Sequence, residues 1–425
     1  MERKRWLNLL MAIASVVIMG GVLGSCGDDE EDTSGTQTEG EDQTDDDDDV
    51  ADDDDVADDD DVADDDDVAD DDDVADDDDV ADDDDVADDD DVTDDDDVTD
   101  DDDVTDDDDD VADDDDVTDD DDDVTDESAV LRGAIEPWLK SVEKKPVITA
   151  DEVKGIIDDP ILSANYTIVD VRENQHFPAG HVPGAVNFFW KDIIKPENLA
   201  ALDPNKIIIT YCYTGHTGAF SMIAYSMLGF DAINMKFGMM GWNDAPEVSP
   251  QPLFNCSPPN YDVETGINEP TETFEIPVLA TGFDTPEEIT LARLEALYTP
   301  EFKPVINASD VKAIVDDPVM AANYQIVDVR EAEHYPLGHL PGAINIWWTD
   351  IAAPENLAKL DPNKTIILYC YTGHTASIAA LALNLLGYEA FTMKYGFMGW
   401  NGAPELNPKP IYNCNPPDYP VETSE

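Results

Sequence analysis

The chain has 425 residues and a formal net charge of −83 at pH 7. Residues 1–127 hold 66 acidic and 3 basic residues, whereas the remainder has a net charge of −20 and is rich in aliphatic and aromatic side chains. Apart from a short basic stretch at residues 3–5, neither part contains a cluster of basic residues. The attraction to phosphate that drives nucleic-acid binding is therefore missing, and we expect no nucleic-acid partner.

The first 25 residues have the pattern of a secretory signal peptide. A basic stretch at residues 3–5 precedes an apolar run to about residue 23, and Gly24-Ser25-Cys26 follows. This ending resembles a bacterial lipobox, in which the cysteine after the cleavage site is lipidated. We therefore expect an exported protein that is anchored to a membrane through lipidated Cys26, in the periplasm, the outer membrane or at the cell surface. A transmembrane anchor that ends in a cysteine is the alternative.

Residues 26–127 are dominated by a six-residue repeat, Asp-Asp-Asp-Asp-Val-Ala, in which Thr later replaces Ala. Blocks of like charge repel one another, and one valine per repeat buries too little surface to offset the entropy of folding. The segment is therefore predicted to be a disordered acidic tether. Calcium binding by its carboxylates is an alternative, but the repeat lacks the glycine turns that shape calcium loops.

The rest of the chain repeats itself with an offset of 158 residues. All six histidines and the four cysteines after Cys26 fall into pairs at this offset. Each copy is about 120 residues long, which is a usual domain size. We therefore predict one domain at residues 128–266 and a second at residues 305–425.

A linker at residues 267–304 separates the two copies. It contains Thr285-Pro286-Glu287-Glu288, followed by a run with helical periodicity. Threonine is a good helix cap and proline is favoured at the first helical position, so this stretch predicts a short helix. Residues 128–145 look like its counterpart before the first copy.

Helical and strand patterns alternate within each copy. Residues 207–211 form a continuous apolar run, which is typical of a strand buried on both faces. The alternation predicts an α/β fold with a mostly parallel central sheet flanked by helices. The elements expected in the first copy are a helix at residues 149–156, strands at 166–171, 185–189 and 207–211, a helix ending at Gly229, and a strand at 232–235.

A cysteine follows this buried strand in each copy, Cys212 in the first and Cys370 in the second. The strand carries it to the carboxyl end of the sheet, where open α/β folds place their ligands. The next residues form a turn that opens a helix, and their N–H groups stabilise a thiolate suited to nucleophilic chemistry. Inert packing is the alternative for a buried cysteine, but the same string recurs in both copies. The predicted active-site loops comprise Cys212, Tyr213, Thr214, Gly215, His216 and Thr217, and Cys370, Tyr371, Thr372, Gly373, His374 and Thr375.

Further motifs give both copies a resemblance to the rhodanese family. Asp170-Val171-Arg172-Glu173 and the Gly-His-Val-Pro-Gly-Ala string at residues 180–185 look like the family's first signature, and residues 238–242 are similar to its closing Gly/Trp motif. The resemblance implies that each cysteine takes a sulfane sulfur from a donor such as thiosulfate or a mercapto acid. The sulfur is then held as a persulfide and passed to a thiol or cyanide acceptor. No metal and no organic cofactor is implied.

The loop distinguishes this chemistry from that of related phosphatases. Their longer loops close on an arginine that clamps phosphate, whereas these six-residue loops contain no arginine. This argues against phosphatase or arsenate reductase activity. Thiosulfate-preferring members carry basic loop residues, and here the variable positions are Tyr, Thr and His, so a less charged donor is an alternative to thiosulfate.

Two arginines have two interpretations each. Arg172 and Arg330 match a family position that can contact the anionic substrate, and we name them as substrate-binding candidates. An ion pair with the neighbouring acid at the strand end is the alternative. Asp170 and Asp328 are expected to fix the loop through hydrogen bonds.

The histidines are assigned by position. His181 and His339 precede a Pro-Gly turn, and we expect them to be structural residues there. His216 and His374 lie inside the loops, where they either tune the thiolate or face solvent. No spacing of histidine and cysteine resembles a zinc site.

Cys256 and Cys414 each lie 44 residues after a predicted nucleophile. Export would place them in an oxidising compartment, where disulfides persist. They could pair with each other across the domains, pair reversibly with Cys212 and Cys370 as resolving thiols, or remain free. We favour the resolving role, because a thiolate with a nearby partner thiol is how redox-active cysteines usually operate.

These observations together predict a rhodanese-type sulfurtransferase with a nucleophile in each domain. A thiol redox protein that uses Cys212 with Cys256 and Cys370 with Cys414 is one alternative. A non-catalytic binding module that reuses the fold is another, although such a module has no need of either thiol.

Overall fold

The computed structural model describes residues 125–141, 145–251 and 253–424. The predicted signal peptide, the lipidation site Cys26 and nearly all of the predicted tether lie outside the described residues. Within the described ranges, no helix is both long enough and apolar enough to span a membrane.

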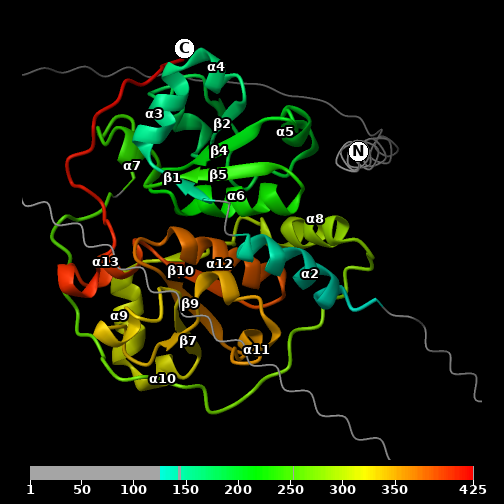
Figure 1. The fold of residues 1–425 in the computed structure, drawn as a ribbon, viewed down its shortest axis with the longest axis vertical. Coiled ribbons are helices and arrows are strands. Elements are labelled where there is room, and N and C mark those ends of the chain that lie inside the picture. The colour runs from blue at the N-terminus through cyan, green and yellow to red at the C-terminus, as the bar shows by residue number, and fades with distance from the viewer. Residues whose placement is uncertain (1–124, 142–144, 252, 425) are drawn as a thin grey trace, which may run out of the picture. The chain divides into compact units, whose positions relative to one another are not determined.

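Each copy of the repeat forms a five-stranded sheet in which all strands are parallel (Figure 1). The strand order is β1-β5-β4-β2-β3 in the first domain and β6-β10-β9-β7-β8 in the second. This confirms the predicted fold class. The strands are β1 Val147–Ile148, β2 Tyr166–Asp170, β3 Val186–Asn187, β4 Ile207–Tyr211, β5 Asp231–Met235, β6 Val305–Ile306, β7 Tyr324–Asp328, β8 Ile344–Asn345, β9 Thr365–Tyr369 and β10 Ala390–Met393.

The central strand β4 is buried on both faces, as its continuous apolar sequence predicts. Successive side chains of a strand point to opposite faces, so Ile208 packs in the core that contains α6, while Ile209 and Tyr211 pack with α3 and α7. The helices of the first domain are α3 Ala150–Asp158, α4 Pro160–Ser163, α5 Pro196–Ala200, α6 His216–Met227 and α7 Gly238–Trp242. Those of the second are α9 Ala308–Asp316, α10 Pro318–Ala321, α11 Pro354–Leu357, α12 His374–Leu385 and α13 Gly396–Trp400.

The two domains share one hydrophobic core, in which α6 packs against α12. Two further helices contribute to it: α2 (Glu127–Lys140), which buries Leu131, and α8 (Pro286–Leu297), which buries Leu294. The helix predicted in the linker is therefore present, with Thr285 as its N-cap and Pro286 in its first turn. Because apolar surface from both domains is buried in one cluster, the halves stabilise each other.

The end of each copy packs on the other domain. Tyr261 N–H donates to Trp400 O at 3.0 Å, and Glu264 pairs with His339 in a short antiparallel bridge. The second copy matches this, with Tyr419 N–H donating to Trp242 O at 2.9 Å and Glu422 bridging to His181. The terminal segment of each copy thus packs on the domain formed by the other copy. Domain boundaries drawn from the sequence at residues 266 and 305 do not reveal this exchange.

Candidate active site

Each predicted nucleophile lies between the end of a central strand and the start of a helix. Cys212 follows β4 and Cys370 follows β9, and both are free thiols with a relative exposure of only 2%. Gly215 and Gly373, at φ of 89° and 90°, cap the helices α6 and α12. Their N–H groups donate to the cysteine Sγ atoms at 3.1 and 3.0 Å. A buried sulfur that faces an N–H group and a helix start is placed to carry negative charge.

A buried ion pair between Asp170 and Arg172 lies at the end of β2, next to β4. Asp170 Oδ2 accepts from Tyr211 Oη at 2.8 Å and from Arg172 Nη2 at 2.6 Å. Arg172 also donates to the carbonyls of Val248 and Gly180, and both charged side chains are fully buried. All three guanidinium nitrogens of Arg172 therefore donate to partners inside the protein, which is how buried charges are accommodated.

The same arrangement recurs in the second domain, where Arg330 pairs with Asp328 at 2.7 Å and Tyr369 Oη donates to the same carboxylate. The structure thus shows the ion-pair alternative for Arg172 and Arg330, and their contact with substrate stays a prediction. Asp170 Oδ1 also accepts from Arg172 N–H at 3.0 Å, so the aspartate's hydrogen bonds hold the end of β2 and, through Tyr211, the strand that leads into the loop.

The second loop residue in each domain meets a histidine that the sequence interpretation left without a role. Tyr213 Oη forms a very short hydrogen bond with His176 Nδ1, and Tyr371 Oη lies 2.5 Å from His334 Nδ1. Burial raises the pKa of Tyr213 to about 12, so its hydroxyl stays protonated near neutral pH. The recurrence of both histidines at the offset of 158 residues is the one feature of the sequence that could have indicated a role for them.

The loop histidines meet across the domain interface. His216 and His374 stack with ring centroids 5.6 Å apart, and both are almost fully buried. His216 Nε2 accepts from Tyr395 N–H at 2.8 Å, and His374 Nε2 accepts from Phe237 N–H at 2.9 Å. Each loop is therefore tied to the backbone of the opposite domain, and the solvent-facing alternative for these histidines is excluded.

These contacts also define the protonation state of the histidines. Burial lowers the pKa of His216 to about 3 and that of His374 well below its usual value, so both rings are neutral at pH 7. A nitrogen that accepts a backbone N–H carries no proton, so the ring proton lies on Nδ1. There it donates to Thr214 Oγ1 at 3.0 Å and, in the other loop, to Thr372 Oγ1 at 2.9 Å.

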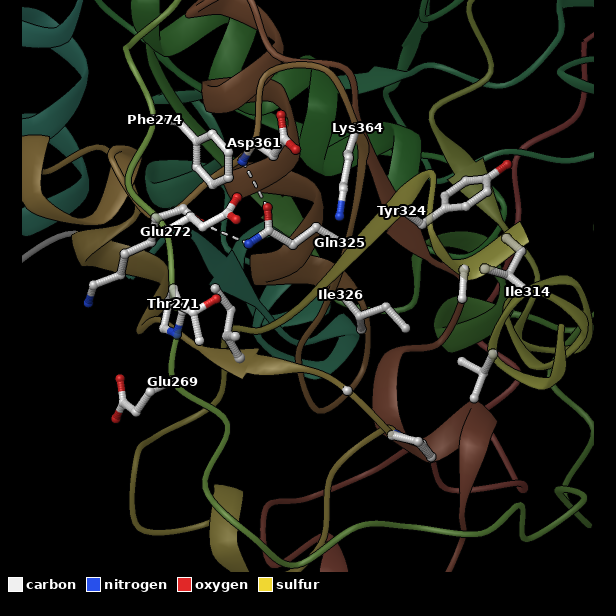
Figure 2. Close-up of a pocket in the computed structure, with 17 residues that line it drawn as sticks. Glu269, Thr271, Glu272, Phe274, Ile314, Tyr324, Gln325, Ile326, Asp361 and Lys364 are labelled. Carbon is white, nitrogen blue, oxygen red and sulfur yellow. Dashed lines mark hydrogen bonds between the residues drawn. The ribbon is translucent and has the colours of Figure 1, made fainter. Parts of the chain in front are cut away.

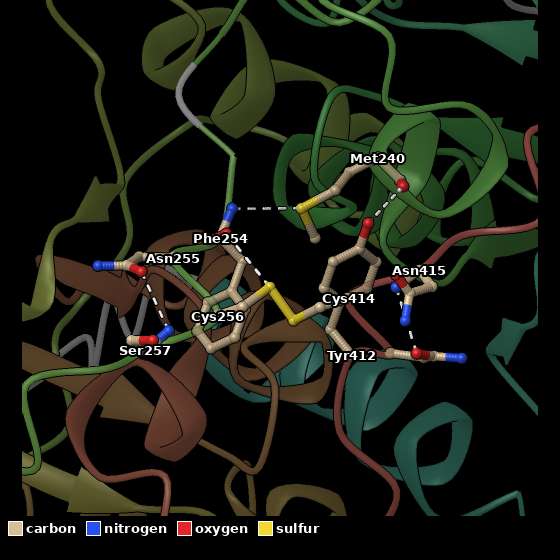
Figure 3. Close-up of a disulfide and its surroundings, with 9 residues drawn as sticks. Met240, Phe254, Asn255, Cys256, Ser257, Tyr412, Cys414 and Asn415 are labelled. Carbon is tan, nitrogen blue, oxygen red and sulfur yellow. Dashed lines mark hydrogen bonds between the residues drawn. A yellow bond between two sulfur atoms is a disulfide. The ribbon is translucent and has the colours of Figure 1, made fainter. Parts of the chain in front are cut away.

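Cys256 and Cys414 are joined to each other by a disulfide (Figure 3). This is the cross-domain pairing, and it corrects our preference for a resolving role, because a cysteine in a disulfide has no thiol with which to resolve another. The two segments come together because each copy's tail packs near the interface. Phe254 packs on Tyr395 with centroids 5.2 Å apart, and Tyr412 packs on Phe237 at 5.1 Å.

A groove lies in the second domain, apart from both cysteines (Figure 2). Its volume is about 510 Å³, and it is lined by Tyr324, Gln325, Lys364 and part of the linker, but by no residue of either loop. Gln325 is already satisfied, because its amide accepts from Asp361 N–H at 2.9 Å and donates to Lys359 O at 2.8 Å. A groove of about 440 Å³ occupies the equivalent place in the first domain. The groove is therefore a property of the fold and separate from the chemistry of the cysteines.

Among the described residues, one group of potential metal ligands lies close together: Glu331, Glu333 and His334. Glu331 is paired with Lys409 at 2.9 Å, and His334 is engaged by Tyr371. These side chains have protein partners, and they lie beside the loop without including its cysteine.

Comparison with known proteins identifies the family of both domains. The rhodanese-like domain family matches residues 149–245 and 308–403. "Putative sulfurtransferase YtwF" of Bacillus subtilis is 32% identical over 84 residues, which are 20% of this chain and 78% of that protein. The thiosulfate sulfurtransferase of Azotobacter vinelandii is 25% identical over 134 residues, 26% of this chain and 48% of that protein.

Two further matches also cover only part of the chain. The tRNA sulfurtransferase of Pyrobaculum aerophilum is 38% identical over 69 residues, and this chain spans only 14% of its length. The solved structure of a rhodanese-like domain protein from Staphylococcus aureus has 32% identity, with a TM-score of 0.21, over 23% of this chain and 92% of that one. With both of its domains matched, the chain belongs to the rhodanese-like domain family.

Proposed function

We propose that the protein is a sulfurtransferase that moves sulfane sulfur through a cysteine persulfide on Cys212 and on Cys370. The observation that carries the proposal is the pair of free, buried thiols, each held against a glycine N–H at the start of a helix. The family membership and the sulfurtransferases among the relatives support the same reaction class.

The proposed reaction has two steps. In the first, the cysteine thiolate attacks the outer sulfur of thiosulfate, a new S–S bond forms, and sulfite leaves with the electron pair of the bond that breaks. With 3-mercaptopyruvate the thiolate attacks the thiol sulfur, the C–S bond breaks, and pyruvate leaves as its enolate with the electron pair of that bond and takes up the proton of the thiol. In the second step, a thiol or cyanide acceptor attacks the outer sulfur of the persulfide and restores the thiolate. The N–H group at Sγ offsets the negative charge that both forms of the cysteine carry.

The alternatives find less support. A dithiol cycle between Cys212 and Cys256, or between Cys370 and Cys414, requires thiols that the Cys256–Cys414 disulfide consumes. A purely non-catalytic module has no use for two identical nucleophilic loops. Removing Cys256 and Cys414 separates the redox interpretation from sulfur transfer, because only sulfur transfer survives their loss.

The test is mass spectrometry of the full chain after incubation with thiosulfate and, separately, with 3-mercaptopyruvate. We expect one added sulfur atom on the peptide that contains Cys212 or Cys370, and its loss as thiocyanate when cyanide is added. If neither cysteine gains sulfur from either donor while both react with an alkylating reagent, the proposal is wrong.

We also propose that the protein is exported and anchored through lipidated Cys26. The cross-domain disulfide supports this, because disulfides persist outside the cytosol and are rare within it. Production in bacteria with labelled palmitate should label the chain, and Cys26→Ser should abolish the label. An unlabelled wild-type chain would contradict the anchor.

A further inference from the structure

The linker between the two copies is seated along one edge of the second sheet. Asn268 Nδ2 donates at 3.0 Å to the carbonyl of Ala343, the residue before edge strand β8, and Phe274 N–H donates to Ala358 O at 2.8 Å. Between these contacts, linker residues in the range 269–274 form one wall of the groove of about 510 Å³ (Figure 2). The second domain therefore holds a non-helical segment of polypeptide beside its edge strand.

The groove of the first domain has the same base but lacks this wall. Each residue that lines it has its counterpart, 158 positions later, in the lining of the second groove. Its lining residues lie between positions 156 and 206 of the described chain, so the linker is not among them. On edge strand β3, Val186 is 40% exposed, whereas its counterpart Ile344 is 7% exposed. The surface beside the linker in the second domain is thus open in the first.

Both grooves begin where a terminal segment of the other copy is bound. Glu264 Oε2 accepts from Gly342 N–H, and Glu422 Oε2 accepts from Gly184 N–H, both at 2.8 Å. The two glycines each line their groove. In the second domain the chain runs from Glu264 directly into the linker. The groove of the first domain therefore continues a surface on which irregular polypeptide already packs.

The charges of the grooves indicate which kind of segment fits. In the second groove, Glu269 and Glu272 of the linker share the lining with Lys359 and Lys364. Among the described residues that line the first groove, Lys206 is the one charged side chain, and three of the others are isoleucines. One cation beside an apolar floor is complementary to an acidic segment that carries a bulky apolar side chain.

We propose that the groove of the first domain is a docking site for a partner protein, which binds through an extended acidic segment with an aromatic side chain in the role of Phe274. Extended peptides bind at sheet edges through backbone hydrogen bonds and through pockets for alternate side chains. Ala200, the counterpart of Ala358, is exposed, so its carbonyl is the expected acceptor for the partner's backbone. The acidic repeats of this chain at residues 26–127 contain no aromatic residue to serve as that anchor.

The test uses a fluorescein-labelled synthetic peptide with the sequence of residues 267–276 and measures its fluorescence anisotropy with the full chain. We expect one peptide to bind per chain, because the second groove already has its linker. Lys206→Glu and Val186→Asp should each weaken binding about tenfold. The matched changes Lys364→Glu, in the second groove, and Val319→Asp, at an exposed apolar residue outside both grooves, should not weaken it. Equal urea midpoints of all four variants control for folding.

Changes in the peptide test the chemistry of the partner. Phe274→Ala in the peptide should weaken binding about tenfold, and Glu269→Gln with Glu272→Gln should weaken it a few-fold at low salt, roughly the strength of exposed ion pairs. A glutamine peptide that binds as tightly as the acidic one would overturn the acidic class of partner.

Three further results would overturn the docking site itself. The first is a peptide that does not bind to the wild-type chain. The second is binding that Lys364→Glu weakens and Lys206→Glu does not, because the peptide then displaces the linker from the second groove. The third is a dimer of the chain in light scattering that Val186→Asp abolishes, which would assign the groove to a second copy. None of these measurements involves the cysteines, so the docking site and the proposed sulfur transfer are tested separately.

Discussion

The two active-site loops have the same sequence but face different residues of the opposite domain. His216 stacks edge to face with the Tyr395 ring at 5.5 Å, whereas its counterpart His374 meets the Phe237 ring at 5.1 Å. Burial raises the pKa of the Tyr395 phenol, and the charge of Cys212 adds to this shift. The two loops have the same sequence, but the residues that surround each loop come from the other domain. The two sites are therefore unequal.

A second difference lies beneath the loops. Asn234 Nδ2 donates to Gly215 O at 3.0 Å in the first domain, and the shorter Thr392 reaches Gly373 O at 3.3 Å in the second. A Cβ at Gly218 would lie 2.4 Å from Asn234 Oδ1, whereas the equivalent position is Ala376. Close packing allows this paired change, in which a larger residue on the strand is matched by a smaller one on the helix.

The disulfide joins the two domains, and its removal should have the largest effect on stability. It closes a loop of 158 residues, and we expect Cys256→Ser with Cys414→Ser to lower the free energy of unfolding by about 2–5 kcal/mol. Urea unfolding measures this loss. Reductant should bring the wild type to the midpoint of the double variant and leave that variant unchanged; equal midpoints for oxidised and reduced wild type would refute the linkage.

A glycine comparison isolates the contact between the loops. Gly215 and Gly229 both have positive φ, but a Cβ at Gly215 would lie 2.3 Å from His374 Nε2, whereas Gly229 has open space. Gly229→Ala should therefore cost only the backbone strain of about 1–2 kcal/mol. Gly215→Ala should cost a further 1–3 kcal/mol or so through overpacking. If both variants lose the same free energy of unfolding in denaturant, His374 is not in close steric contact with position 215.

Acid should weaken the interface through the stacked histidines. The pKa of His216 falls from 6.5 to about 3 on folding. Below pH 6.5 the unfolded chain therefore binds a proton that the folded protein does not, and the free energy of unfolding decreases as the pH is lowered. Each buried histidine should contribute up to about 1.4 kcal/mol per pH unit there. The positive charge of Lys394 adds to the effect of burial in lowering the pKa of His216.

His216→Gln tests this directly, since the amide oxygen keeps an acceptor near Tyr395 N–H but does not titrate. Unfolding free energies between pH 7 and 5 should show a shallower slope in the variant than in the wild type. Identical slopes would show that His216 is protonated in the folded protein as readily as in the unfolded one.

The smallest effect sharpens the difference between the two sites. Tyr395→Phe makes the surroundings of Cys212 like those of Cys370, and we expect a change of only a few-fold in persulfide formation at Cys212, of the order of 1 kcal/mol. Phe237→Tyr is the matched exchange at the other site. Site-resolved mass spectrometry measures persulfide at both cysteines in one sample. A changed rate at Cys370 in Tyr395→Phe, with Cys212 unaffected, would show that the ring influences the cysteine of its own domain.

Much of the fold was predictable because its signals are local. The apolar run of β4, the turn glycine at position 215 and the Thr285-Pro286 helix start each act over a few residues. The position of the proposed nucleophiles followed from the same pattern, since a cysteine after a buried strand reaches the sheet edge.

The contacts between domains were not predictable in this way. The pairing of Cys256 with Cys414, the histidine stack and the exchanged tails all depend on how the two copies pack, and a repeat in one dimension carries no such information. Arg172 was left with two interpretations for a related reason. Its burial and its carbonyl partners come from segments far along the chain, such as Val248.

The most direct test of the account follows persulfide formation in Cys212→Ser, Cys370→Ser and the double variant. Incubation with thiosulfate should load one sulfur atom on the remaining cysteine of each single variant and none on the double variant, and cyanide should release it as thiocyanate. Sulfur on the double variant, at Cys256 or Cys414 or elsewhere, would contradict the assignment of the nucleophiles. A single variant whose remaining thiol reacts with iodoacetamide but never loads sulfur would contradict the claim that both domains are catalytic.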